Sequence, residues 1–136
     1  MKCNVTRLLV ISILVSLWGC GGPSAPSQNQ PYTQSISGTV SVFGTTRHAR
    51  TIPRNGQMRL TLSWQGSTDL DLYLTNSSCQ ALYPKSQCSV LLASDSAVGT
   101  QEVIARSVAS GETYGIFVDN LSASNANSYT LDIRIQ

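Results

Sequence analysis

The sequence predicts an all-β protein: a single antiparallel β-sandwich of jelly-roll type that follows a signal peptide and a flexible tether. Three observations lead to this prediction. From residue 36 to the C-terminus, apolar and polar residues alternate with a period of two, which is typical of half-buried strands. Clusters of Gly, Asn, Asp and Ser separate the alternating runs, as turns do. No segment after residue 35 keeps a helical period, and the 101 residues from 36 to 136 suffice for one core.

The first three predicted strands lie in the first half of this domain. Residues 36–43 form the first one, because apolar residues recur there between serines, glycine and threonine. The second covers residues 58–64, in which Met, two Leu and Trp alternate with Arg, Thr and Ser. The third covers residues 70–74, in which three leucines alternate with Asp71 and Tyr73. Each leucine-bearing face is expected to point into the core.

The second half of the domain carries four more predicted strands. Residues 90–93 and 102–108 show the less regular patterns, with apolar residues that are not strictly alternating. Residues 114–118 place Tyr, Ile and Val on one face, and residues 129–135 place Tyr, Leu and two Ile on one face. Short strands at such regular spacing are typical of a two-sheet sandwich.

The N-terminal segment has the parts of a secretory signal peptide. Lys2 and Arg7 precede an apolar run over residues 8–17, which is about half the length that a membrane-spanning helix needs. The run ends in Leu-Trp-Gly before Cys20, which resembles a bacterial lipobox. This resemblance implies that residues 1–19 are removed and that Cys20 is acylated with fatty-acid chains such as palmitate. Two or more chains hold a protein stably on a membrane.

Residues 20–35 are predicted to form a flexible tether behind the lipidated cysteine. They are small, polar and punctuated by proline, and a coil of this length has a typical end-to-end distance of about 20 Å. Gly21 follows Cys20, whereas the sorting rule of one bacterial group requires Asp there for retention in the inner membrane. The expected localisation is therefore the bacterial cell envelope, on the outer membrane.

The charge of the mature chain argues against a strong net field over the whole domain. Of nine basic residues, Lys2 and Arg7 belong to the signal peptide, so the mature chain has seven basic and seven acidic residues. A balance near zero argues against nucleic acid as a partner. Arg47 and Arg50 lie in a short arginine-rich stretch, which is either a solvated strand-loop face or a contact for an anionic surface.

Cys79 and Cys88 are the cysteines that remain beside the lipidated Cys20. In a chain exported to an oxidising compartment they are expected to form a disulfide. Closing a loop of ten residues contributes about 2.7 kcal/mol in the chain-entropy model. A metal site is the alternative, but neither cysteine has a further Cys or His nearby to complete four ligands.

Four blocks of the chain resemble the bacterial pre-peptidase C-terminal (PPC) domain family, in that family's order. They are residues 60–74 (LTLSWQGSTDLDLYL), 92–96 (LASDS), 110–118 (SGETYGIFV) and 128–131 (SYTL). The resemblance covers residues 36–136 and implies a β-sandwich of jelly-roll type. Members of the family usually follow secreted proteases, where they assist secretion or hold the enzyme on a substrate. No protease domain accompanies this one, and its Cys79–Cys88 segment is an insertion.

Calcium is the one cofactor that the resemblance raises, because collagen-binding relatives bind it. Asp69 and Asp71 lie two apart and project to one face of a strand, and Asp95 is a further candidate ligand. Together they supply part of the six to eight oxygens that calcium takes. However, residues 21–50 lack the acidic residues that calcium-binding relatives carry there. A calcium site and an exposed polar strand face both stay open.

The sequence is not expected to encode an enzyme. His48 is the only histidine, both remaining thiols are expected to be oxidised, and no nucleophile, phosphate-loop or metalloprotease motif occurs. A carboxylate pair such as Asp71 and Glu102, acting as in a small hydrolase, is the least favoured alternative.

The expected function is that of a lipid-anchored, non-catalytic binding or adaptor module for an envelope protein or a wall or matrix polymer. Its partners are the membrane, through the lipid on Cys20, and that unidentified protein or polymer. Tyr73, Arg47 and Arg50 are candidate binding-surface residues, although packing under a loop is the favoured reading of Tyr73. Two alternatives are a structural subunit of an envelope or secretion assembly and a calcium-dependent matrix-binding module.

Overall fold

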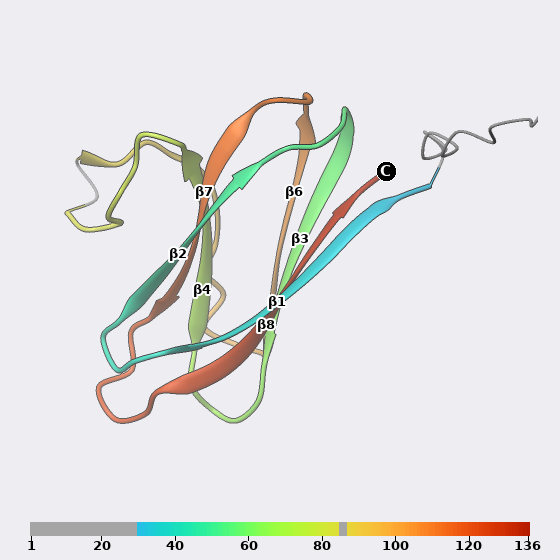
Figure 1. The fold of residues 1–136 in the computed structure, drawn as a ribbon. Coiled ribbons are helices and arrows are strands. Elements are labelled where there is room, and N and C mark those ends of the chain that lie inside the picture. The colour runs from blue at the N-terminus through green and yellow to red at the C-terminus, as the bar shows by residue number, and fades with distance from the viewer. Residues whose placement is uncertain (1–29, 85–86) are drawn as a thin grey trace, which may run out of the picture.

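Eight antiparallel strands form the domain in a computed structural model that describes residues 30–84 and 87–136 (Figure 1). One sheet has the strand order β1-β8-β3-β6 and the other the order β2-β7-β4-β5. The strands are β1 (Tyr32–Val40), β2 (Thr45–Thr51), β3 (Gly56–Trp64), β4 (Leu70–Asn76), β5 (Val90–Ser94), β6 (Gln101–Val108), β7 (Thr113–Asn120) and β8 (Asn127–Ile135).

The strand order confirms the predicted sandwich. The chain passes between the two sheets at most of its turns, and only β4 and β5 are successive strands that pair within one sheet. Eight strands wound in this way make a jelly roll. In the described residues no helix is long and apolar enough to cross a membrane.

The core lies between the sheets and is built from the alternating residues. Leu60 and Leu62 of β3 face Leu72 and Leu74 of β4, and all four side chains are fully buried. Period-two alternation has this consequence because successive side chains of a strand point to opposite faces. The structure therefore confirms the predicted strands at 58–64, 70–74, 114–118 and 129–135.

The N-terminal half departs from the prediction in two places. β1 begins at Tyr32, inside the segment 20–35 expected as tether, and ends at Val40 instead of Phe43. This corrects the predicted domain boundary at residue 36. β2 was not predicted, because Thr45–Thr51 contains no alternating apolar residues, and it is held by its pairing with β7 along seven residues.

The sandwich has two poles that face in opposite directions along the strands (Figure 1). At the tether pole lie the first residue of β1 and the last residue of β8. At the distal pole lie the four connections 41–44, 65–69, 95–100 and 121–126. The signal peptide, Cys20 and the tether up to residue 29 lie outside the described residues.

Candidate binding surfaces

The segment between β4 and β5 forms a loop, residues 77–89, that covers the outer face of the second sheet. The predicted disulfide between Cys79 and Cys88 is present, with 5.0 Å between the two Cα atoms. We call this segment the stapled loop. Leu82 of the loop packs on Tyr73 of β4 and Phe117 of β7, which makes a second apolar cluster outside the main core. The packing of Tyr73 is thereby confirmed, and the prediction that it forms an exposed binding surface is wrong.

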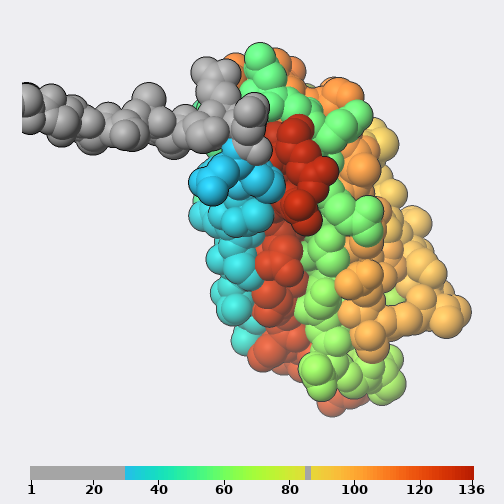
Figure 2. Space-filling view, turned by 90° about the vertical axis from the view of Figure 1, so that its right-hand side faces the viewer, coloured from blue at the N-terminus to red at the C-terminus, as the bar shows by residue number. Residues whose placement is uncertain are grey.

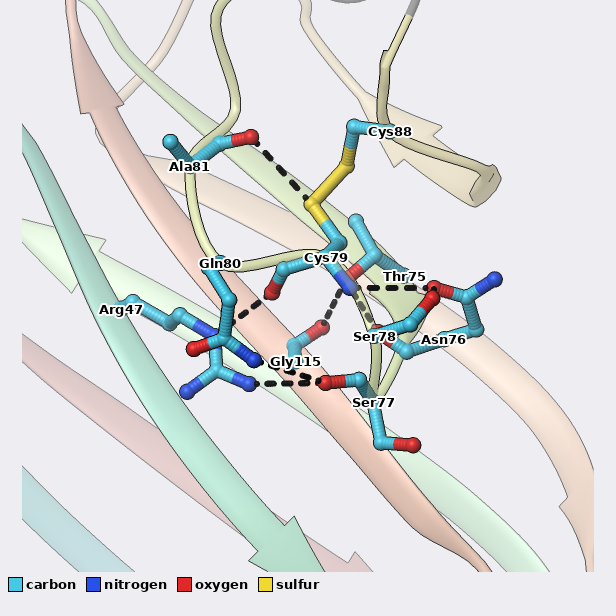
Figure 3. The surroundings of a disulfide bond; sticks show 10 residues. All are labelled: Arg47, Thr75, Asn76, Ser77, Ser78, Cys79, Gln80, Ala81, Cys88 and Gly115. Atoms are coloured by element: carbon cyan, nitrogen blue, oxygen red, sulfur yellow. Dashed lines mark hydrogen bonds between the residues drawn. A yellow bond between two sulfur atoms is a disulfide. The ribbon is translucent and has the colours of Figure 1, made fainter.

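Arg47 fastens the start of the stapled loop to β2 (Figure 3). Its Nε donates to the carbonyl oxygen of Cys79 at 2.8 Å, and its Nη2 donates to the carbonyl oxygen of Ser77 at 3.2 Å. The guanidinium also lies over the Phe117 ring, 6.0 Å from its centroid. The side chain of Asn76 accepts from the backbone N–H of Cys79 at 3.2 Å. Arg47 therefore positions a loop instead of offering a free cation to a partner.

Two acid–tyrosine pairs lie beneath the stapled loop. Asp71 of β4 stands opposite Asp119 of β7 in the strand register, and both carboxylates are buried. Tyr73 donates to Asp71 at 3.0 Å, and Tyr83 of the stapled loop donates to Asp119. Thr45 of β2 donates to the other oxygen of Asp119 at 2.8 Å. Each carboxylate is thus hydrogen-bonded, as buried polar groups generally are.

Burial sets the protonation of this cluster. It raises the pKa of Asp71 to about 6, against the opposing effect of the hydrogen bond from Tyr73. The neighbouring carboxylates of Asp69, Asp119 and Asp95 raise it further. Burial and the hydrogen bond to Asp119 raise the pKa of Tyr83 to about 12, so its hydroxyl stays a donor at neutral pH. Burial and nearby like charges both raise the pKa of a carboxyl because they disfavour its ionised form.

We expect Asp71→Asn to stabilise the domain at neutral pH by about 2 kcal/mol. A carboxyl whose pKa is raised by folding stabilises the folded state fully below the unfolded pKa near 4, and that contribution is lost as pH rises through about 6. An amide accepts the same hydrogen bond from Tyr73 and can donate to Asp119. Urea unfolding from pH 4 to 7 checks this. The difference between variant and parent should grow over that window and stay constant above it.

The matched control is Asp132→Asn, because Asp132 is exposed and lies on β8 of the other sheet. The difference between this variant and the parent should not change between pH 4 and 7 in the way expected for Asp71→Asn. If Asp71→Asn also follows the parent, the buried carboxylate does not titrate with a raised pKa.

Calcium binding gains no support from the arrangement of the predicted ligands. Asp71 is buried and hydrogen-bonded to Tyr73, Asp69 is half-buried in the 65–69 connection, and Asp95 is exposed. Within residues 30–84 and 87–136, no three or more His, Cys, Asp or Glu side chains form a group that could hold a metal ion. The strand face of Asp71 is not the exposed polar face that was the alternative, because the stapled loop covers it.

The remaining candidate groups are engaged in separate contacts. Arg50 projects from β2 to the face opposite Arg47, and its Nη1 donates to the carbonyl oxygen of Ala49. His48 lies 2.8 Å from the Tyr129 hydroxyl, and burial, followed by the charge of Arg50, lowers its pKa. Glu102 accepts from the Ser94 hydroxyl and from the backbone N–H of Ser96. Arg47 and Arg50 therefore do not form one basic surface.

The outer face of the first sheet carries a shallow polar hollow. Figure 2 shows this face, with β1, β8, β3 and β6 side by side. The hollow has a volume of about 590 Å³, and its lining contains no Asp, Glu, Lys, Arg or His. Hydroxyl groups dominate it because small residues face outward from three neighbouring strands. The lining consists of Ser37, Gly38, Thr39, Ser63, Trp64, Gln65, Ser128, Tyr129 and Thr130.

A second exposed feature is an apolar tip on the distal pole, formed by Val42, Phe43 and Leu121. Their exposed fractions are 42%, 71% and 54%. The two connections that carry them lie side by side, because the backbone N–H of Phe43 donates to the carbonyl oxygen of Ser122 at 3.1 Å. Phe43 has a φ of +48°, a conformation that costs a residue with a side chain about 1–2 kcal/mol.

Asn120, the last residue of β7, holds together the two connections that carry the apolar tip. Its side chain is fully buried, and its Nδ2 donates to the carbonyl oxygens of Ser41 and Asn125, at 3.1 and 2.9 Å. Its Oδ1 accepts from the backbone N–H of Ser122 at 2.9 Å. Sequence reasoning missed the tip because it placed Phe43 at the end of a strand. It considered Asn120 only as a possible oxygen ligand for calcium and missed its role in holding the two connections.

Comparisons with known proteins identify the fold. No family model matches this chain, and no curated protein matches it. The mitogen derived from Yersinia pseudotuberculosis is a similar solved structure, with 18% identity, coverage of 79% of this chain and 88% of that one, and a TM-score of 0.55. The pre-peptidase C-terminal domain of a Bacillus anthracis collagenase has 11% identity, coverage of 74% and 88%, and a TM-score of 0.55.

A third similar structure is PliG of Aeromonas hydrophila, a periplasmic inhibitor of g-type lysozyme. It has 16% identity, coverage of 76% of this chain and 86% of that one, and a TM-score of 0.54. At these identities the likeness concerns the fold alone. The PPC-like sandwich that the sequence motifs implied is therefore confirmed as a fold.

Proposed function

We propose that this chain is a lipid-anchored, non-catalytic adaptor of the bacterial envelope that binds a protein through its stapled loop. The observation that carries the proposal is the way this loop is held. A disulfide, two hydrogen bonds from Arg47 and the Tyr83–Asp119 bond fix it on a rigid sheet. Because these contacts hold residues 77–84 and 87–89 before binding, they have little conformational entropy left to lose on binding.

The exposed surface of the loop suits a protein partner. The sequence of the loop contains a single charged residue, Lys85, and of its described residues Gln80, Ala81 and Tyr83 are exposed. Tyrosine, serine and other small polar residues on loops make adaptable hydrogen bonds at low entropic cost, as in antibody binding sites. Loops on a rigid scaffold are also where binding residues concentrate. The PliG inhibitor shares this fold, which supports the capacity of such a sandwich to bind an enzyme.

The absence of catalysis in the proposal follows from what the reactive groups do. Cys79 and Cys88 form the disulfide. His48 lies against the Tyr129 hydroxyl, and burial lowers the pKa of the histidine. Asp71 and Glu102 belong to separate hydrogen-bond networks. The lipobox before Cys20 supports anchoring, Gly21 supports the outer membrane, and the periplasmic location of PliG is compatible with this compartment.

Affinity capture with the full chain tests the proposal. The full chain, Ala81→Arg and Ala97→Arg are each used to capture material from a detergent extract of the envelope. Ala81 lies on the stapled loop and Ala97 on the distal pole, and both are exposed, so each substitution adds the same charged side chain without filling the core. We expect a protein retained by the parent and by Ala97→Arg, and lost from Ala81→Arg.

The retained material also separates the alternatives. Carbohydrate that all three chains retain equally would assign the function to the polar hollow and to a wall or matrix polymer. A complex of fixed size that survives detergent and contains several subunits would favour a structural subunit. Equal retention of the protein by all three chains would contradict the stapled loop as the binding surface.

A further inference from the structure

The apolar tip of Val42, Phe43 and Leu121 is exposed and belongs neither to the stapled loop nor to the polar hollow. We propose that this tip enters the lipid bilayer that holds the acyl chains of Cys20, as a second, non-covalent membrane contact that orients the domain. The inference rests on the proposed lipid anchoring. It extends that proposal by assigning a membrane-facing pole to the folded domain itself.

The backbone of the apolar tip is suited to a medium without water. Polar backbone groups that enter lipid must be satisfied internally. Gly44 donates to the carbonyl oxygen of Ser41, Asn120 donates from its backbone to Gly44, and its side chain bonds Ser41 and Asn125. The Ser122 hydroxyl accepts from the backbone N–H groups of Ser124 and Asn125 at 3.2 and 3.3 Å. Hydrogen bonds within and between the two connections thus replace many of those that water would supply.

The composition of the apolar tip points the same way. Residues 41–44 and 121–126 contain no Asp, Glu, Lys or Arg, so insertion buries no charge. Phe43 occupies the third position of a turn closed by the Gly44–Ser41 bond, with a positive φ that glycine or asparagine usually supplies. Strained positions of this kind cluster at functional sites. The turn therefore displays an aromatic ring where folding alone would favour glycine.

The size of the tip favours a bilayer over a protein partner. A specific protein interface buries about 800 Å² on each side and involves about 20–30 residues. Three side chains fall far short of such an interface. They are sufficient for a chain that its anchor already keeps at the membrane, because the second contact is then intramolecular in effect.

The geometry of the chain permits this contact although the tip and β1's first residue lie at opposite poles. Tyr32 comes twelve positions after Cys20, and a chain of that length spans at most about 40 Å. The nine residues of β1 span about 30 Å. The connection from the anchor is therefore long enough to let the distal pole reach the same bilayer.

Fluorescence in vesicles tests the proposal. The full chain is purified from bacterial membranes and returned to phosphatidylcholine vesicles whose acyl chains carry bromine, which quenches indole emission on contact. Phe43→Trp places an indole on the apolar tip, and the matched Ala109→Trp places one on an exposed residue of the tether pole. Both variants retain the buried Trp64, so it contributes equally. We expect a blue shift and a loss of emission for Phe43→Trp and not for Ala109→Trp.

Two further variants keep the outcomes distinct. Phe43→Gly should melt with the parent, because glycine tolerates the positive φ. When Phe43→Gly is bound to vesicles, the rest of its apolar tip, Val42 and Leu121, should become accessible to a water-soluble protease that does not cleave the parent. Cys20→Ser should leave the vesicles altogether. If the parent also leaves them, the anchoring and the inference both fail. If the parent stays bound while the indole of Phe43→Trp remains unquenched, the tip does not enter the bilayer and the anchoring stands.

Discussion

Replacing Cys79 and Cys88 together by serine is expected to lower the free energy of unfolding by about 3–4 kcal/mol. The disulfide closes a loop of ten residues, and its loss returns about 2.7 kcal/mol of chain entropy to the unfolded state. Both sulfurs lie in the apolar cluster with Tyr73 and Phe117, so serine hydroxyls there add the cost of a buried polar group. Urea unfolding of the pair variant against the parent measures the sum.

The double alanine variant separates the two contributions. Cys79→Ala with Cys88→Ala removes the cross-link without burying hydroxyls, and it should fall between the parent and the serine pair. Reduction of the parent by dithiothreitol should match the alanine pair closely. A serine pair as stable as the parent would show that Arg47 and Leu82 hold the loop without the disulfide.

The fold was predictable from the sequence where one face of a strand meets the core. β3 and β8 bury alternate residues, and period-two alternation records that directly. β4 and β7 show the same alternation in sequence, although the structure buries both of their faces. β2 escaped prediction because its pairing with β7 is made by backbone groups, which carry no signature in side-chain type. The first residues of β1 were not predicted as strand either, because β1 is an edge strand and Thr33 and Ser35 on it face solvent.

The candidate site was predictable only in part. The alternation placed Asp71 and Tyr73 on one face, and the cysteine spacing predicted the disulfide, but neither showed that the stapled loop folds back over that face. This covering depends on long-range contacts, such as those of Arg47 and Tyr83. The role of Asn120 depends on two connections that are about 80 residues apart in the chain and meet only in the folded state.

The burial of Asp71 and Asp119 and the fixed position of the stapled loop both result from the packing of the loop on the second sheet. The stapled loop excludes water from the outer face of β4 and β7, which is why burial is the largest cause of the raised pKa of Asp71. The neighbouring carboxylate of Asp119 helps to hold the loop by accepting from Tyr83. The sheet therefore gives up some stability at Asp71, and in return residues 77–84 of the loop are held in place before any partner arrives.

Asn120→Ala is expected to lower the free energy of unfolding by about 2–4 kcal/mol. The substitution removes two donors and one acceptor, and it leaves the carbonyl oxygens of Ser41 and Asn125 and the N–H of Ser122 without these partners. The side chain is fully buried, so water reaches these groups only if the two connections separate. Asn127→Ala is the control, because Asn127 is half-buried and makes one such bond, to the carbonyl oxygen of Gln65.

Asn120→Asp distinguishes hydrogen bonding from filled volume at the same position. Aspartate matches asparagine in size but turns an acceptor oxygen toward two carbonyl oxygens, so it should destabilise the domain at least as much as alanine. Because a carboxyl buried there is easier to accommodate when protonated, the loss should grow as the pH rises above 4. Equal stability of Asn120→Asp and the parent at pH 7 would mean that these connections are held by packing. The order of the apolar tip would then not depend on the amide.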